Sequence, residues 1–218
     1  MTLNAARTLL LEIDVQNDFC SGALAVQNAV EVIPPLNALA AAVTAKGGCA
    51  AATQDWHPWG HSSFASSYSG KSPGDIIDTE TVNGQVLWPD HCIQGSWGAA
   101  FHEQLNLDPV SFIIRKGLQK TLDSYSAFFE NDRRTPTGLE GLIRGLGIET
   151  VIIGGLATDY CVFYSAMDCK RLGLATIIAG DAVRGVDFPA GSVDNAVKEM
   201  KKNGIEFISS AELIGRLK

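Results

Sequence analysis

Residues 154–161 read Gly-Gly-Leu-Ala-Thr-Asp-Tyr-Cys, and they join two segments of different pattern. The apolar run before them predicts a buried strand, and the segment from Thr158 to Leu172 predicts a helix with Thr158 as its N-cap. Cys161 would then lie on the first helical turn, where backbone N–H groups lower the pKa of a thiol and can bind an oxyanion. The alternative is a small core residue on an amphipathic helix, because free cysteines are among the most buried residues.

The rest of the chain repeats this alternation of strand and helix. Near-continuous apolar strands flanked by helices are typical of a parallel sheet covered on both faces. We therefore expect one α/β domain over residues 1–218, with three layers and a six-stranded, mostly parallel sheet. The expected strands are 9–15, 49–53, 111–115, 151–154, 175–179 and 205–209, and the expected helices are 34–46, 139–146, 158–172, 192–203 and 211–217.

One long polar stretch, residues 54–102, interrupts the alternation. It is rich in Gly, Ser and His, and it contains all four tryptophans of the chain, Trp56, Trp59, Trp88 and Trp97. A loop region of this length in a compact domain is usually functional or disordered, and the tryptophans argue against disorder. We expect this region to carry a metal site and a substrate pocket.

Composition excludes several classes of partner. The formal net charge of -7 without a basic cluster makes nucleic acid a poor partner, and the chain lacks the run of about 18 apolar residues that a membrane span needs. Residues 8–15 contain Glu12 and Asp14 and lack a small-residue cleavage site, which favours a strand over a signal peptide. A small neutral substrate remains open, as does a homo-oligomer.

The cysteines indicate a reducing compartment. Five of them are scattered along the chain without a CxxC pair, which argues against a disulfide framework and against a thiolate zinc site. We expect a cytoplasmic protein. The five are Cys20, Cys49, Cys92, Cys161 and Cys169.

Polar residues follow four of the expected strands. Ligands of open α/β sheets bind outside the carboxyl ends of the strands, where Asp14, Asp55, Lys116 and Cys161 would meet. Burial should raise the pKa of Asp14 unless a cation such as Lys116 lies near it. With Cys161 beside them, the pair becomes a base, a charge stabiliser and a nucleophile. The alternative is an ion pair that only ties two strand ends together.

A second group of residues has the spacing of metal ligands. Asp55 and His57 alternate in an extended segment, so both side chains could face one ion, and His91 is the best third ligand. This oxygen and nitrogen set suits one divalent metal, with zinc first and manganese or iron as alternatives. His61 and His102 compete for the third place, and a single helical turn would bring His61 to His57.

Three aromatic residues occur near these groups. Phe19, Trp88 and Tyr125 offer flat rings that would suit a planar aromatic ligand. Core filling is the alternative, and it is stronger for Phe19 than for the two amphipathic rings.

Six motifs together resemble the nicotinamidases, or pyrazinamidases, of the cysteine-hydrolase (isochorismatase-like) superfamily. They occur in order over nearly the whole chain, and the second and third point to the nicotinamidase branch in particular. The motifs are Asp14-Val15-Gln16-Asn17-Asp18-Phe19-Cys20, Gln54-Asp55-Trp56-His57-Pro58, Trp88-Pro89-Asp90-His91-Cys92, Lys116-Gly117, Asp123-Ser124-Tyr125-Ser126-Ala127-Phe128 and Gly155-Leu156-Ala157-Thr158-Asp159-Tyr160-Cys161-Val162.

The resemblance implies an isochorismatase-like hydrolase fold and assigns roles to the polar residues. The catalytic triad would be Asp14, Lys116 and Cys161, and the metal ligands would be Asp55, His57 and His91. Ser63 falls where members of the family vary among Ser, His and Glu, as a further ligand that binds directly or through water.

The resemblance also implies how a substrate would bind. Phe19 and Trp88 would sandwich a pyridine ring, with Tyr125 as a wall. The bond from Leu156 to Ala157 would be cis and line the substrate site, so that the N–H groups of Ala157 and Cys161 form an oxyanion hole.

The implied reaction is hydrolysis of nicotinamide, and of pyrazinamide, through a cysteine thioester, with a role in NAD salvage. The alternatives are another amide hydrolase of the superfamily and a non-enzymatic metal-binding or redox-sensing protein. Glu12 departs from the family pattern, because its strand position is usually apolar there, and the sequence offers no functional reason for it.

Overall fold

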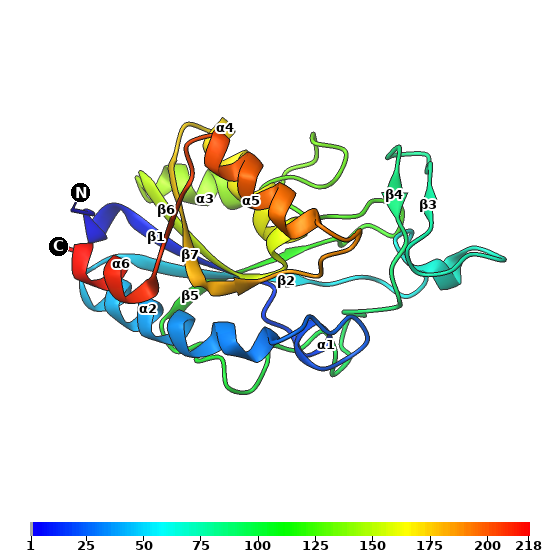
Figure 1. The fold of residues 1–218 in the computed structure, drawn as a ribbon, viewed down its shortest axis with the longest axis horizontal. Coiled ribbons are helices and arrows are strands. Elements are labelled where there is room, and N and C mark those ends of the chain that lie inside the picture. Colours follow the sequence, from blue (N-terminus) through cyan, green and yellow to red (C-terminus); the bar gives the residue numbers. More distant parts are fainter. Residues whose placement is uncertain (1) are drawn as a thin grey trace.

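A six-stranded sheet forms the centre of the computed structural model, which describes residues 2–218. Its strand order is β5-β2-β1-β6-β7-β8, and every pair of neighbours is parallel (Figure 1). The predicted fold class is confirmed, and the sheet is wholly parallel rather than mostly so. The strands are β1 Thr8–Ile13, β2 Cys49–Asp55, β5 Val110–Lys116, β6 Thr150–Leu156, β7 Ala175–Arg184 and β8 Glu206–Ile208.

Helices cover both faces of the sheet (Figure 1). The helix α2 (Ile33–Ala45) and the C-terminal helix α6 (Ser210–Arg216) lie on one face, with the short α1 (Asn17–Cys20) beyond them. The opposite face carries α3 (Leu139–Gly145), α4 (Phe163–Arg171) and α5 (Ser192–Lys202). Within the described residues, no helix has the length and apolar character needed to cross a membrane.

The strand β1 shows why both faces need cover. Leu9, Leu11 and Ile13 belong to one hydrophobic cluster, and Leu10 belongs to the other. Successive side chains of a strand point to opposite faces, so a strand that is apolar throughout must be buried on both sides.

The junction at residues 154–161 differs in detail from the prediction. Helical structure begins at Thr158 itself, and Ala157 occupies the N-cap position without a side-chain hydrogen bond. Thr158 is therefore not the N-cap. The first turn, Thr158–Val162, is π-helical and continues into α4. Gly155 has a φ of +119°, and a Cβ there would overlap the carbonyl oxygen of Ile13, so only glycine lets β6 approach β1 this closely.

The region from 54 to 102 contains secondary structure that the sequence did not reveal. An antiparallel pair of short strands, β3 (Ile76–Ile77) and β4 (Gln85–Val86), forms a hairpin at the end of the molecule opposite the chain termini (Figure 1). A 3-10 turn, Ala65–Ser67, precedes it. Isolated bridges pair Phe64 with Trp88, and His57 with Ile93, so the two ends of the region lie side by side.

Glu12 is a carboxylic acid inside the hydrophobic sheet. It lies in β1 between Ala52 and Gly154 of the neighbouring strands and is fully buried. Neither of its carboxyl oxygens has a hydrogen-bond partner among the described residues. Burial raises the pKa of Glu12 from 4.5 to about 8, so this side chain carries a proton at neutral pH.

Glu12 should make stability depend on pH. Its folded pKa of about 8 exceeds its unfolded value of 4.5, so the free energy of unfolding should fall as pH rises between these values. We expect Glu12→Gln to remove this part of the slope, and Glu12→Leu to stabilise the fold by roughly 1–3 kcal/mol at about pH 8.

Urea unfolding at about pH 5.5 and about pH 8 measures both effects. The Gln variant is the matched control, because it keeps the shape of the side chain and cannot ionise. An equal stability difference between wild type and Glu12→Gln at the two pH values would contradict the assignment.

Candidate active site

Four polar side chains meet at the carboxyl ends of four adjacent strands. Asp14 follows β1, Asp55 ends β2, Lys116 ends β5, and Cys161 lies beyond β6 on the π-helical turn. The sheet order β5-β2-β1-β6 makes these ends neighbours. The structure therefore brings together the residues that the sequence predicted to share one edge of the sheet.

Lys116 is the centre of this group. Its ammonium lies 2.9 Å from Asp14 Oδ2 and 3.5 Å from Cys161 Sγ, and it also donates a hydrogen bond to Asp55 Oδ1. It also donates a hydrogen bond to the Ser124 carbonyl at 3.0 Å. Burial alone would lower the pKa of Lys116, but the two carboxylates raise it well above its ordinary value. The ammonium therefore stays charged although it is fully buried.

The orientation of Asp14 is set by a left-handed backbone conformation and by two hydrogen bonds with the Thr53 hydroxyl. Its φ is +49°, and its N–H group donates to Thr53 Oγ1, which in turn donates to Asp14 Oδ1 at 2.6 Å. Burial raises the pKa of Asp14, and Lys116 partly opposes this effect. Asp14 is thus a buried carboxyl with a raised proton affinity beside the Cys161 thiol.

The predicted lowering of the thiol pKa is wrong. Burial raises the pKa of Cys161 well above its ordinary value, and the negative charges of Asp14 and Asp55 raise it further. Lys116 lowers the pKa, but it does not compensate for burial. At rest, the thiol therefore holds its proton, and a nucleophilic sulfur would need a base.

The two residues expected to form an oxyanion hole both lie at the pocket. The peptide bond between Leu156 and Ala157 is cis. Ala157 and Cys161 both line the pocket beside the thiol, whereas Leu156 packs in the hydrophobic core. The Ala157 N–H group donates no backbone hydrogen bond among the described residues.

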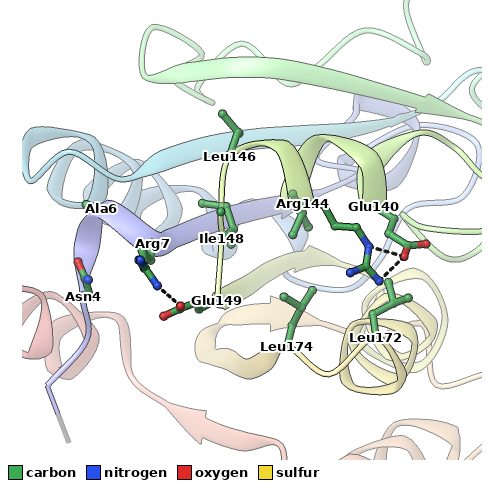
Figure 2. A pocket seen from close by; sticks show the side chains of 12 residues that line it. Asn4, Ala6, Arg7, Glu140, Arg144, Leu146, Ile148, Glu149, Leu172 and Leu174 are labelled. Atoms are coloured by element: carbon green, nitrogen blue, oxygen red, sulfur yellow. Dashed lines mark hydrogen bonds and ion pairs between the residues drawn. The ribbon is translucent and has the colours of Figure 1, made fainter.

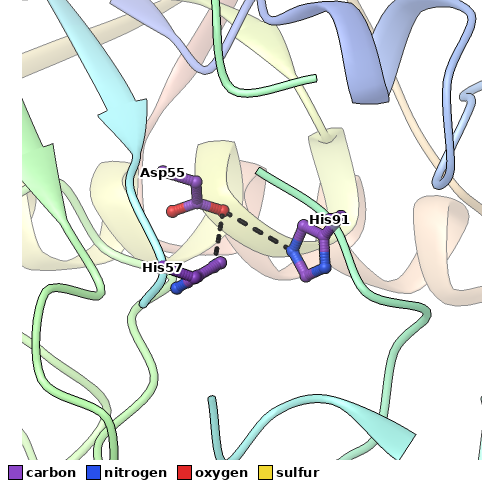
Figure 3. Close-up of side chains that lie close together, drawn as sticks. All are labelled: Asp55, His57 and His91. Atoms are coloured by element: carbon purple, nitrogen blue, oxygen red, sulfur yellow. Dashed lines mark ion pairs between the residues drawn. The ribbon is translucent and has the colours of Figure 1, made fainter. Parts of the chain in front are cut away.

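Asp55, His57 and His91 form a buried cluster of metal-ligand character (Figure 3). Asp55 Oδ2 lies 3.5 Å from His57 Nε2 and 3.9 Å from His91 Nε2. The other ring nitrogens face backbone carbonyls, with His57 Nδ1 3.1 Å from Gly117 O and His91 Nδ1 2.8 Å from Pro89 O. These carbonyls favour protonated Nδ1 atoms, which leaves both Nε2 atoms free as ligands.

The donor set fits a divalent metal. His57 Nε2 is buried without a hydrogen-bond partner in the described structure, and an unprotonated nitrogen in that position is suited to a metal. Burial raises the pKa of Asp55, but Lys116 and His57 lower it more, so the carboxyl is ionised. A carboxylate and two imidazoles are typical ligands of zinc, manganese and iron.

Of the other candidate ligands, His61 lies beside the cluster, Ser63 contacts His61, and His102 lies in none of the groups of close donor atoms among the described residues. The His61 ring stacks on His57 at a centroid distance of 4.2 Å, without the helical turn that the sequence suggested. His61 Nδ1 lies 2.8 Å from Ser63 Oγ, so Ser63 contacts His61 directly. His57, His61 and Asp123 form a second group of close donor atoms, whereas His102 belongs to none of the groups found in residues 2–218.

A pocket opens beside Cys161 and the metal-ligand cluster. Phe19, Trp88 and Tyr125 all line it, and Trp88 Nε1 donates to Tyr125 Oη at 3.2 Å. The sequence did not single out five other lining residues. Asp123, Ser124 and Tyr160 belong to two of the six family motifs, whereas nothing in the sequence pointed to Leu24 or Val186. The lining residues are Phe19, Leu24, Asp55, Trp88, His91, Asp123, Ser124, Tyr125, Ala157, Tyr160, Cys161 and Val186.

A wider cavity of about 590 Å³ lies elsewhere (Figure 2). Residues before β1 and β6 and the helix α3 line it, so it lies at the amino ends of the strands. It contains the ion pairs Arg7–Glu149 and Arg144–Glu140 and none of the predicted site residues. Size alone therefore does not mark the reactive site.

Comparisons with known proteins agree with this geometry. The model of the isochorismatase domain family matches residues 8–212. A nicotinamidase from Acinetobacter baylyi is 44% identical over 209 residues, which is 94% of each chain.

Two solved structures extend the comparison. A nicotinamidase and pyrazinamidase from Acinetobacter baumanii superposes with a TM-score of 0.90 at 42% identity, over 95% of this chain and 98% of the other. A pyrazinamidase from Pyrococcus horikoshii in complex with zinc has a TM-score of 0.76 at 32% identity, over 93% and 99% of the two chains.

Replacing Lys116 should lower the free energy of unfolding, because two buried carboxylates lose their cation. We expect Lys116→Met to destabilise the fold by about 3–5 kcal/mol at neutral pH, because Asp14 and Asp55 become unpaired buried charges. Urea unfolding measures the loss. The double variant Lys116→Met with Asp14→Asn should recover part of it, and a double variant less stable than Lys116→Met would contradict this explanation.

Metal affinity should depend on the cluster in Figure 3. We expect the protein to bind one divalent ion per chain, and His57→Ala to weaken zinc binding by at least about 100-fold, because it removes a ligand. Competition with a chromophoric chelator measures the affinity. His102→Ala is the control, and equal affinities for the two variants would exclude His57 as a ligand.

Proposed function

We propose, starting from the fact that this chain belongs to the isochorismatase family, that it is a metal-dependent nicotinamidase. It would hydrolyse nicotinamide to nicotinate and ammonia, and pyrazinamide to pyrazinoate, within one catalytic domain. One observation carries the proposal: Cys161, two of the candidate metal ligands and three aromatic rings line a single pocket, and the Lys116 ammonium contacts Cys161. The two ligands are Asp55 and His91, and the rings are those of Phe19, Trp88 and Tyr125. The names of the related enzymes support the same substrate class. Nicotinate release would place the enzyme in NAD salvage.

The proposed reaction begins with a proton transfer. Asp14 would take the proton of Cys161, whose raised pKa requires a base, and the Lys116 ammonium would stabilise the thiolate from 3.5 Å. Both acidic groups are buried next to the same cation. The proton therefore moves inside the group without a change in its net charge.

The sulfur would then attack the carbon of the carboxamide. The developing oxyanion would accept hydrogen bonds from the N–H groups of Ala157 and Cys161. Asp14 would return its proton to the departing nitrogen, which leaves as ammonia. A thioester between nicotinate and Cys161 would remain, and water activated by Asp14 would hydrolyse it.

Ring placement would come from the pocket walls. Phe19 and Trp88 would hold the two faces of the ring, and Tyr125 would close one side. Asp55, His57 and His91 would hold the metal, which when bound would supply a Lewis-acid contact that orients the ring nitrogen. Zinc is our first choice, with manganese or iron as alternatives.

Cysteine replacement tests the proposal. Purified wild-type protein should release ammonia and nicotinate in equal amounts from nicotinamide, and Cys161→Ala should lower kcat by about a thousandfold or more. The variant should still bind nicotinamide in calorimetry, because the ring contacts remain. Cys169→Ala is the matched control, since Cys169 is a buried cysteine further along the same helical segment, outside the pocket. A kcat for Cys161→Ala equal to that of the wild type would exclude the covalent mechanism.

A further inference from the structure

The β3–β4 hairpin reaches the substrate pocket through one buried side chain, Gln85. This residue begins β4 and is only 3% exposed, although it does not line the pocket itself. Its Nε2 donates to Asp123 Oδ2 at 2.7 Å and to the Val86 carbonyl at 2.8 Å. Both hydrogens of the Gln85 side-chain amide are therefore donated, and one of them binds the carboxyl group of Asp123, which lines the pocket.

Asp123 starts a run of three residues that line the pocket. Its other oxygen, Oδ1, accepts the N–H group of Ser124 at 2.8 Å. The Ser124 carbonyl accepts a hydrogen bond from Lys116, and Tyr125 forms one wall. The position of the Asp123 carboxyl thus bears on the whole segment that faces the ring.

Two hydrogen bonds join the arm formed by residues 85–88 to the pocket wall formed by residues 123–125. Gln85 binds Asp123, and Trp88, three residues further along the arm, donates through Nε1 to Tyr125 Oη at 3.2 Å. Tyr125 Oη also lies 3.5 Å from Gln85 Nε2, so the two contacts adjoin each other. The bond to Asp123 involves a carboxyl group, and charge-assisted hydrogen bonds are roughly twice as strong as neutral ones.

We propose that Gln85 is a positioning residue, which sets the distance between Trp88 and Tyr125 and so holds the walls that grip the substrate ring. The kinetic part of this inference rests on the proposed function. Gln85 acts on ring binding, through the arm and the Asp123–Tyr125 segment. Gln85 donates to neither Lys116 nor Cys161, which lie at the end of β5 and on the turn after β6, so we expect a smaller effect on the reacting groups than on the ring walls.

Gln85→Leu is the first test, because leucine fills the space without donating a hydrogen bond. We expect KM for nicotinamide to rise about tenfold and kcat to change less than about threefold. Thr81→Val is the matched control, since Thr81 Oγ1 ties the same hairpin to the Thr121 carbonyl at an exposed position. Its kcat and KM should stay within about twofold of wild type. Equal KM values for the two variants, or a loss confined to kcat, would overturn the proposal.

A double-mutant cycle tests the specific contact. Gln85→Glu alone places two carboxyl groups against each other, and we expect it to raise KM more than Gln85→Leu does. In an Asp123→Asn background the donor and acceptor are exchanged, so Gln85→Glu should raise KM less than about twofold relative to Asp123→Asn. Additive effects of the two substitutions would contradict a direct contact.

Hydrogen exchange gives a readout that needs no substrate. We expect Gln85→Leu to accelerate amide exchange in residues 123–131, where the Asn131 N–H group donates to the Asp123 carbonyl. Thr81→Val should leave exchange there unchanged. Unchanged exchange in Gln85→Leu would overturn the positioning role. If wild type fails to act on nicotinamide, only the proposed function falls, because exchange still decides the role of Gln85.

Discussion

A fully buried lysine is the constraint on which the site depends. Lys116 can keep its charge inside the protein only because it pairs with the carboxylates of Asp14 and Asp55 and donates a hydrogen bond to the Ser124 carbonyl. The two carboxylates come from different strands, and a parallel sheet in the order β5-β2-β1-β6 is what puts their ends side by side. The same cation contacts Cys161 and the candidate metal ligand Asp55, so it links the thiol to the candidate metal cluster.

Burial determines the chemistry open to this group. The low-dielectric surroundings raise the proton affinity of both Asp14 and Cys161, so the thiol is not a ready-made thiolate. A nucleophilic role of this sulfur would need a base, and Asp14 is a buried carboxyl close to it. Transfer of a proton between two neighbours of Lys116 leaves the total charge of the site constant, which is the least costly way to activate a nucleophile in an apolar interior.

The sequence allowed good prediction of the sheet and of the residues at its carboxyl edge. Strands buried on both faces leave a continuous apolar pattern, and a charged residue at the end of such a strand is conspicuous. The contacts of Gln85 could not be read in this way, because they depend on how a polar loop region folds back across the pocket. The N-cap at Ala157 rather than Thr158 and the raised thiol pKa also depend on tertiary packing. Glu12 was visible as a departure in the sequence, but only its burial without partners gives it a physical consequence.

The covalent role of Cys161 is the central claim, and trapping the acyl-enzyme tests it most directly. Metal-loaded protein would be mixed with nicotinamide, quenched in acid during turnover, digested and analysed by mass spectrometry. We predict a nicotinoyl group on Cys161, located by fragmentation of its peptide because Cys169 lies only eight residues further along, and none on Cys20, Cys49, Cys92 or Cys169. Hydroxylamine added during turnover should intercept the same intermediate as the hydroxamate. Steady turnover with no adduct at any quench time and no hydroxamate would contradict the account.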